Sequence, residues 1–318
     1  MANDDIEKLN EIFFPSLMKK INYIKTYNLD FAHYTNAEAA LSIIDKQELW
    51  MTEIDTMNDY TEFSHGVDCF KKALEGNTGK AITEIFDNLT EGHFSSHIIN
   101  NIIDFRQNPD NKIYSISCSE HHSLNDRLGK LSMWRGYSGN DEKVAFILKG
   151  DVLLDKENSL NIWSTPVAYL DALEFKQRLL DICLNIEENK KFILGLKEKN
   201  SRNLAQKIYL VLLFAMLSVK HKGFYEEQEW RVVYLPSQFT SDPDKVISGN
   251  RTRKDVEEPI FKIQLKGKLD LNKILEKIII GPSRNPELLE ADLIKTLNQK
   301  GVKNAADKII ISDIPLRT

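Results

Sequence analysis

The chain has 318 residues, of which 42% are hydrophobic and 28% are charged, and its formal net charge is −5. Such a chain can bury a full core, either as one large domain or as one domain with a sizeable insertion. Because the net charge is negative, no net positive electrostatic field surrounds the whole protein. The composition therefore requires no nucleic-acid partner, although it is compatible with a local basic groove.

The N-terminal sequence, the apolar runs and the cysteine spacing of the chain favour a cytoplasmic location. Residues 1–5 are acidic and lack the apolar stretch of a secretory signal. The longest apolar run, residues 208–219, is too short to span a bilayer and predicts a buried helix. Cys69, Cys118 and Cys183 are widely spaced and form neither a disulfide framework nor paired zinc ligands. We expect a reduced, cytoplasmic protein with no membrane partner.

Helical and strand patterns alternate along the N-terminal half. Apolar residues at helical spacing predict a helix over residues 5–27, and residues 29–34 are typical of a short strand. A Thr-x-x-Glu capping box at Thr35 then predicts a helix through Ile44. Met57-Asn58-Asp59 predicts a turn. Further strands are expected over residues 48–52, 113–118 and 144–148.

The C-terminal half begins with a predicted pair of helices, residues 171–199 and 203–220, which carry a dense apolar face. Residues 240–258 mix Pro, Gly and charged residues and predict a mobile loop. Strands are expected over residues 230–235, 260–265, 278–280 and 309–311, with a helix over 286–299. This order predicts a single α+β domain over residues 1–318, with a helical insertion at about 170–222.

Four short stretches are rich in chemically useful side chains: residues 31–35, 57–59, 134–137 and 224–231. They supply a His at a strand end, an aromatic-plus-Arg turn, and a carboxylate cluster that opens a strand. None of the four is a metal or phosphate-loop signature.

In their order along the chain, these stretches resemble the uncharacterised bacterial domain-of-unknown-function family 2971. The resemblance rests on His33-Tyr34-Thr35, Met57-Asn58-Asp59, the Ser115-Ile116-Ser117-Cys118-Ser119 segment and the Met133-to-Tyr137 block. It continues through residues 223–231 and the late Ile279-Ile280-Gly281-Pro282.

The layout is also similar to the ADP-ribosyltransferase fold of the His-Tyr-Glu type, which implies a split β-sheet core and NAD as co-substrate. There a His lies in the first strand, a Tyr follows the next core strand through a short helix, and a Glu begins a later strand. His33, Tyr137 and Glu229 occur in that order. Glu227-Gln228-Glu229 also resembles the Glu-x-Glu pair of toxin members whose first-strand residue is Arg, so two subclasses are mixed here.

The chemistry of NAD cleavage suits these residues. Nicotinamide leaves as a neutral group, so no general acid is needed, and Glu229 is expected to stabilise the positive charge that develops on the ribose. Glu227 is the candidate for orienting or deprotonating the acceptor. If residues 227–230 are extended, Glu227 and Glu229 share one face of the strand.

The remaining candidates are expected to bind NAD. Tyr137 would stack on nicotinamide, His33 would bond the adenosine ribose, and Arg135 would hold the pyrophosphate. Tyr34 is grouped with them, with a core aromatic as its alternative. A structural role is the alternative for His33 too, and Arg135 and Arg231 are alternatively members of an ion network with Glu226 or Glu227.

Other clusters are weaker candidates. His93 and His97 share a helix face but lack the Glu of a His-Glu-x-x-His motif, so no metal site is expected. Cys118 and its neighbouring histidines match no zinc spacing, and Cys118 is expected to be buried. Basic residues at 220–222 and 251–254 would guide a phosphate backbone only if they flank the carboxylates in space.

The sequence therefore predicts a bacterial NAD-dependent ADP-ribosyltransferase without a metal, a toxin or antiviral effector that modifies a macromolecule. RNA is the first expected acceptor and protein the second, with an antitoxin as a further partner. The alternatives are a NAD glycohydrolase, in which water replaces the acceptor, and a non-catalytic sensor that binds a nucleotide or a partner protein.

Overall fold

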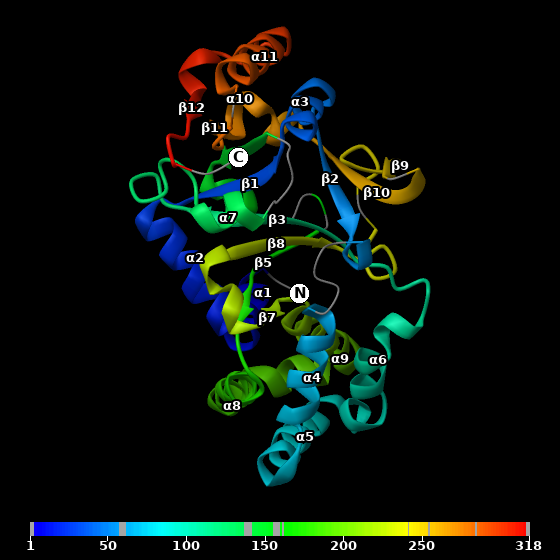
Figure 1. The fold of residues 1–318 in the computed structure, drawn as a ribbon. Coiled ribbons are helices and arrows are strands. Elements are labelled where there is room, and N and C mark those ends of the chain that lie inside the picture. The colour runs from blue at the N-terminus through cyan, green and yellow to red at the C-terminus, as the bar shows by residue number, and fades with distance from the viewer. Residues whose placement is uncertain are drawn as a thin grey trace. The chain divides into compact units, whose positions relative to one another are not determined.

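The computed structural model describes residues 3–56, 62–136, 142–154, 160, 162–240, 242–253, 255–283 and 285–315. It combines many helices with a mixed β-sheet, so the predicted α+β class is confirmed. By its internal contacts the chain divides into two compact units, whose elements are labelled in Figure 1. The helical unit comprises residues 1–22, 57–112 and 166–225, and the sheet unit comprises 23–56, 113–165 and 226–318.

The helical unit is built mainly from helices, with one short parallel strand pair. Its helices are α1 (Asn3–Phe13), the first part of α2 (Pro15–Tyr27), α4 (Glu62–Ala73), α5 (Gly76–Thr90), the π-helical turn η2 (Phe94–Ile98), α6 (Ile99–Ile103), η3 (Phe105–Gln107), α8 (Ala172–Glu188), α9 (Lys190–Leu217) and most of η5 (Lys222–Glu227). The strand pair is β6 (Ala168–Tyr169) with β7 (Val219–Lys220). The helical stretch expected at about 170–222 lies within residues 166–225, the last segment of this unit. Residues 1–22 and 57–112 belong to the same unit.

Two helix boundaries in this unit differ from the sequence prediction. The helix expected over residues 5–27 is two helices, because Pro15 begins α2 and its ring and missing N–H suit only a first turn. The break expected near residue 200 lies instead at Asn189, whose main-chain N–H bonds the carbonyls of Asn185 and Glu187. Residues 200–202 are polar but include neither Gly nor Pro, so they continue α9.

Close packing in the helical unit depends on one glycine. A Cβ at Gly66 of α4 would lie 2.2 Å from the carbonyl oxygen of Met216 in α9, so only glycine allows these two helix backbones to approach so closely.

Within its described residues, the sheet unit contains ten strands. They are β1 (Asp30–Asn36), β2 (Glu48–Glu53), β3 (Tyr114–His121), β4 (Lys143–Leu148), β5 (Trp163–Pro166), β8 (Glu229–Tyr234), β9 (Val246–Arg253), β10 (Val256–Gln264), β11 (Leu275–Ile280) and β12 (Ile309–Ile311). Their main path runs β12-β11-β4-β1-β3-β2-β10-β9, and β8 pairs with both β3 and β5. The pairs β1-β3, β1-β4, β2-β3, β2-β10, β3-β8, β4-β11 and β9-β10 are antiparallel, and β11-β12 is parallel.

The sheet divides at β3. On one edge, β8 runs along residues 114–119 of β3. On the other edge, β1 pairs with residues 119–121 and β2 pairs with residues 114–115, so β1 and β2 share this edge and diverge from it (Figure 1). Ser117 lies between the two pairings, at the point of division.

Helices cover the two faces of the β1-β4-β11 part of the sheet. One face packs with α3 (Ala37–Lys46), α10 (Leu271–Ile274) and α11 (Pro286–Gln299) in one apolar cluster. The opposite face carries Ala32, Tyr34, Ala145, Ile147 and Ile279, which pack with Trp134 of α7 (Leu131–Gly136). This alternation buries apolar side chains on both faces, as the unbroken apolar run of β4 predicts. Short 3₁₀ turns complete the unit: η1 (Ile54–Thr56), η4 (Gly150–Leu154), η6 (Gly267–Leu269) and η7 (Ala306–Lys308).

Two further sequence predictions are wrong in the sheet unit. The cap of α3 is Asn36 rather than Thr35, because the Asn36 side chain accepts from the Ala39 N–H at 2.8 Å. The loop expected over residues 240–258 forms β9 and the start of β10. β9 is an edge strand, where solvated charged residues protect the open side, so its sequence lacks an apolar strand pattern.

Among the helices of the described residues, none is long and apolar enough to cross a membrane.

Candidate functional site

Ser117 joins two of the residues that the sequence singles out. His33 Nδ1 lies 3.0 Å from the Ser117 carbonyl oxygen, and the Ser117 hydroxyl donates to Glu229 Oε1 at 2.5 Å. His33 comes from β1 and Glu229 from β8, the strands on either side of β3. The imidazole bonds a main-chain carbonyl at the point where β1 and β2 diverge. We call His33, Ser117, Glu229 and Arg231 the Ser117 cluster.

The hydrogen bond to Ser117 determines the tautomer of His33. A carbonyl oxygen only accepts, so Nδ1 must carry the proton. Burial lowers the pKa of His33 below its ordinary 6.5, against the opposing effect of this bond, so the ring is neutral at pH 7. Nε2 is therefore an acceptor, which suits a hydroxyl group such as that of a ribose.

Glu229 begins β8 and forms a two-point ion pair with Arg231, two residues further along. Arg231 Nε donates to Oε1 and Nη2 donates to Oε2, both at 2.9 Å. The side chains are only 7% (Glu229) and 9% (Arg231) exposed, so this is a buried, charge-assisted pair. The Ser117 hydroxyl adds a third bond to the same carboxylate.

Residues 227–230 are not extended throughout, so the condition under which Glu227 and Glu229 share one strand face is not met. Glu227 ends η5, and Gln228 has a left-handed φ of 43°, so Glu227 and Glu229 do not alternate as two residues of one strand. The turn is held by β3: Ser119 Oγ donates to the Glu227 carbonyl at 2.5 Å, and the Glu120 N–H donates to the Gln228 carbonyl at 2.9 Å. Tertiary contacts thus maintain a backbone conformation that is unfavourable for glutamine.

Lys130 crosses this turn. Its ammonium donates to Gln228 Oε1 at 2.7 Å and to Ser119 Oγ at 3.0 Å. Its main-chain N–H donates to the Tyr34 hydroxyl at 2.9 Å. Lys130 therefore links the turn before Glu229 to the β1 strand.

Tyr34 is a core residue. Adjacent residues of a strand point to opposite faces, so Tyr34 and His33 diverge. Tyr34 is 2% exposed, packs edge-on against Trp134 with ring centroids 4.8 Å apart, and belongs to the apolar cluster on its face of β1. This placement agrees with the core alternative rather than with cofactor binding.

The other predicted binding residues lie elsewhere or outside the described residues. Arg135 is exposed in the last turn of α7. Tyr137 and Met57-Asn58-Asp59 fall in stretches that the structure does not describe.

The strand registers show toward which face of the sheet the Glu229 and His33 side chains point. Glu229 is level with Ser119, and Ser119 with Ala32, so Glu229 points to the face that Ala32 and Tyr34 share. His33 starts on the opposite face. The two side chains therefore approach Ser117 from different directions.

Three of the basic residues predicted as a phosphate guide, Lys220, Lys222 and Arg251, are engaged within the protein. The Lys222 ammonium lies 2.8 Å from Asp171 Oδ2 and 3.0 Å from Glu174 Oε1, and Arg251 pairs with Glu258 at 2.5 Å. Lys220 is buried with its ammonium 4.6 Å from the centre of the Phe224 ring.

The cysteine and histidine candidates show no catalytic arrangement. Burial raises the pKa of Cys118 to about 12, with the Glu229 charge adding to the effect, so its thiolate is disfavoured. The His93 and His97 rings lie 5.5 Å apart. Within the described ranges, no group of three or more His, Cys, Asp or Glu residues could hold a metal ion.

The sequence assigned no role to Ser117 or Lys130, and it offered an ion pair of Arg231 with Glu226 or Glu227 only as an alternative. The alternating serines of β3 were a usable signal, because hydroxyls repeated at period two place polar groups on one face of a buried strand. No sequence pattern marks Lys130, whose role depends on a tertiary contact.

Comparisons with known proteins place part of the chain in relation to a family. No curated protein and no solved structure matches the chain. Residues 133–232, which include Glu229 and Arg231, match a family described as "Protein of unknown function (DUF2971)", and the resemblance to that family is thus confirmed over this part of the chain.

Proposed function

We propose that the chain is an NAD-dependent ADP-ribosyltransferase, acting as a bacterial toxin or antiviral effector on a macromolecule, RNA first and protein second. The observation that carries the proposal is the Ser117 cluster. A first-strand His and a Glu that begins a later strand are hydrogen-bonded to one serine of the strand between them. The short helix α7 that precedes Tyr137 fits the same layout.

NAD, when bound, supplies the ADP-ribosyl group and a neutral nicotinamide leaving group. The neutral His33 ring would accept from a ribose hydroxyl through Nε2, since Nδ1 is committed to Ser117. The donor set thus fits a ribose.

Glu229 would stabilise the positive charge that develops at the ribose. The Ser117 hydroxyl and Arg231 fix the orientation of its carboxylate, and a preorganised charge needs no rearrangement during the reaction. Arg231 also offsets part of the Glu229 charge, which is the feature expected of a structural pair. A catalytic Glu229 and a purely structural Glu229 predict different effects of its substitution on NAD turnover.

The His33 and Glu229 side chains leave β1 and β8 toward different faces, so one ligand must reach both at the division of the sheet. Arg135, exposed at the end of α7, is proposed to hold the pyrophosphate, and Tyr137 to stack on nicotinamide. Glu227 is proposed to act on the acceptor, from the end of η5.

Product analysis with NAD labelled in the adenylate tests the proposal. Label on RNA or protein supports the transferase, and free ADP-ribose indicates a glycohydrolase. Binding of NAD without turnover indicates a sensor. Absence of both binding and turnover with the full chain, over RNA and protein acceptors, contradicts the proposal. An antitoxin partner is expected if wild-type expression stops growth and a Glu229→Ala variant does not.

A further inference from the structure

The sheet unit contains a cavity of about 900 Å³ at the end of the β1-β3 ladder. Its floor is one face of five neighbouring strands. Asp30 is level with His121, Ile147 is level with Ala32, and Ile279 is level with Ile310. These registers place the lining residues His121, Asp30, Ile147, Ile279 and Ile310 on the same side of the sheet.

His121 is a buried residue with one ring nitrogen that has no partner among the described residues. It ends β3, is 4% exposed, and its Nδ1 has no hydrogen-bond partner among the described residues. Burial lowers the pKa of His121 to about 4, so the ring is neutral at pH 7. Leaving such a nitrogen unbonded is unfavourable, and His121 is also one of the residues that line the cavity.

Asp30 stands directly across the ladder from His121 and also lines the cavity. Burial raises the pKa of Asp30 to about 6, although a hydrogen bond from the Gly150 N–H at 3.2 Å opposes the shift. Gly150 is required there, because a Cβ would lie 2.0 Å from the Leu29 carbonyl oxygen. At pH 7 the carboxylate is an acceptor that can take two parallel N–H donors.

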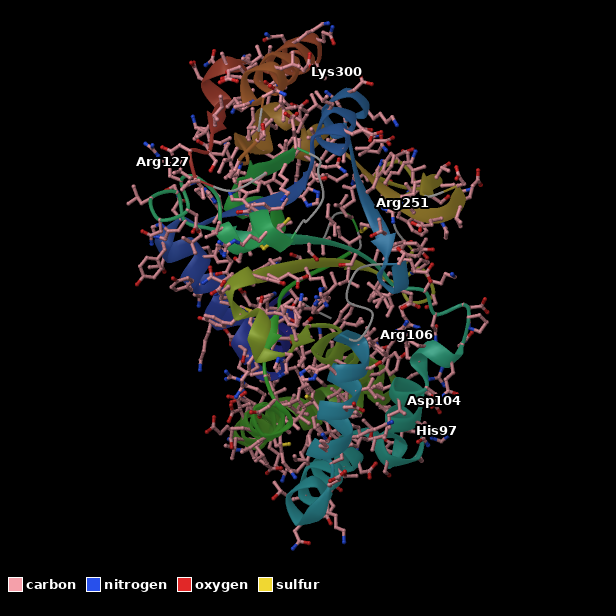
Figure 2. All side chains as sticks on the ribbon, viewed as in Figure 1. His97, Asp104, Arg106, Arg127, Arg251 and Lys300 are labelled. Atoms are coloured by element: carbon pink, nitrogen blue, oxygen red, sulfur yellow. The ribbon has the colours of Figure 1, made fainter. Side chains whose placement is uncertain are left out.

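The rim of the cavity is predominantly cationic. Lys25 follows Ile24 near the end of α2, Arg127 lies on the loop after β3 in Figure 2, and Lys149 follows β4. Glu276 and Asp151 are the carboxylates of the same rim. Together with Lys277, whose ammonium donates to the Asp307 carbonyl at 2.7 Å, four cations line the cavity against the three carboxylates of Asp30, Asp151 and Glu276, and this excess favours a ligand that carries an acidic group.

We propose that this cavity binds a guanine nucleotide. The apolar floor of Ile147, Ile279 and Ile310 accepts a flat heterocycle, and the Asp30 carboxylate takes the two adjacent N–H donors of the guanine edge. His121 supplies a further hydrogen bond to the base, and the rim cations hold the phosphate. None of the described lining residues belongs to the Ser117 cluster, so this site is separate from the proposed NAD site.

Isothermal titration of the full chain with guanosine 5′-monophosphate, which is not a fragment of NAD, tests the proposal. We expect saturable binding of one molecule, at least about tenfold weaker binding of guanosine and of uridine 5′-monophosphate, and no binding of inorganic phosphate alone. Absence of saturable binding below about 1 mM would overturn the proposal, as would equal affinity for both monophosphates.

Variants locate the site. Arg127→Ala, at an exposed position, should weaken the monophosphate by about tenfold and leave guanosine unchanged. Arg178→Ala, an exposed arginine of α8 in the helical unit, is the matched control and should change neither. Asp30→Asn keeps an acceptor for Gly150 and should weaken both ligands. Unchanged affinity in both Arg127→Ala and Asp30→Asn contradicts the proposal.

Glu229→Gln separates this inference from the proposed function. Guanosine monophosphate binding should be unaffected by Glu229→Gln and by excess NAD. Competition by NAD together with loss of binding in Glu229→Gln would assign the ligand to the Ser117 cluster and overturn a second site. Failure of NAD turnover alone leaves the predicted binding unchanged.

Discussion

Arg231 and Glu229 lie two residues apart on β8 and share two hydrogen bonds of 2.9 Å, with the Ser117 hydroxyl bonded to the same carboxylate. Residues at this spacing point to one face of a strand, so the pair is formed within β8 itself. The buried carboxylate is thereby kept in one orientation. The same geometry serves either a structural ion pair or a preorganised catalytic charge, and substitutions distinguish them.

Glu229→Gln preserves the size and hydrogen-bonding shape of the side chain but removes its charge. If Glu229 stabilises the ribose cation, NAD turnover should fall by about 10²-fold or more. The fold should lose up to about 3 kcal/mol, because Arg231 keeps an acceptor but loses its charged partner in a buried site. Turnover assays at a temperature well below the unfolding midpoint measure the first effect, and urea denaturation measures the second.

Glu226→Gln is the matched control, since Glu226 is exposed in the neighbouring turn. It should change neither turnover nor stability measurably. Normal turnover in Glu229→Gln would show that the carboxylate is structural only.

Ser117→Ala removes the hydroxyl that orients Glu229 and retains the carbonyl that His33 binds. We expect kcat to fall by about tenfold, with KM for NAD little changed, and stability to fall by about 1 kcal/mol for one hydrogen bond. Ser115→Ala is the control on the same strand, because the Ser115 hydroxyl donates to the Val232 carbonyl instead. Equal kinetic effects of the two substitutions would argue against a positioning role for Ser117.

Stability at low pH should depend on His121. Its pKa is about 4 in the folded protein and 6.5 in the unfolded chain, so the unfolded chain takes up the proton first. The contribution of neutral His121 to the free energy of unfolding is full above pH 6.5 and is lost as the pH falls toward 4. At 1.36 kcal/mol per pH unit, the loss is about 2 kcal/mol between pH 6.5 and 5.

His121→Leu should therefore flatten the dependence of unfolding free energy on pH between 6.5 and 5, as measured by urea denaturation. Asp30→Asn should steepen this pH dependence, because the contribution of Asp30 to the unfolding free energy changes with pH in the opposite direction. The pKa of Asp30 is raised from 3.8 to about 6, so its contribution is present below 3.8 and lost as the pH rises through 6. Identical pH profiles for wild type and His121→Leu would contradict the assignment.

Native cysteines should react slowly with thiol reagents. Cys69, Cys118 and Cys183 are all buried, and burial raises the pKa of each thiol, to about 12 for Cys118 and Cys183. Little thiolate is therefore present at pH 8. Titration with a chromogenic disulfide should detect all three thiols of the chain promptly in denaturant and little reaction without it. Rapid reaction of a native thiol would show that its segment opens.

Local patterns predicted many of the elements. The apolar run of β4 and the proline-initiated α11 carry their own signals, since burial on both faces needs continuous apolar residues and a first-turn proline suits a helix start. Predictions failed where partners decide the conformation. Gln228 has no sequence preference for a positive φ, and it adopts one because Ser119, Glu120 and Lys130 hold the turn.

The sequence by itself determined the α+β class, the buried nature of Cys118 and the position of His33 in a strand, because periodicity and burial are local properties. Only the tertiary structure decided that Ser117 joins His33 and Glu229, that Tyr34 packs against Trp134, and that Asp30 meets His121 at a cavity. Strand order and register bring together residues far apart in the chain, and a one-residue change of register would turn each of them to the other face.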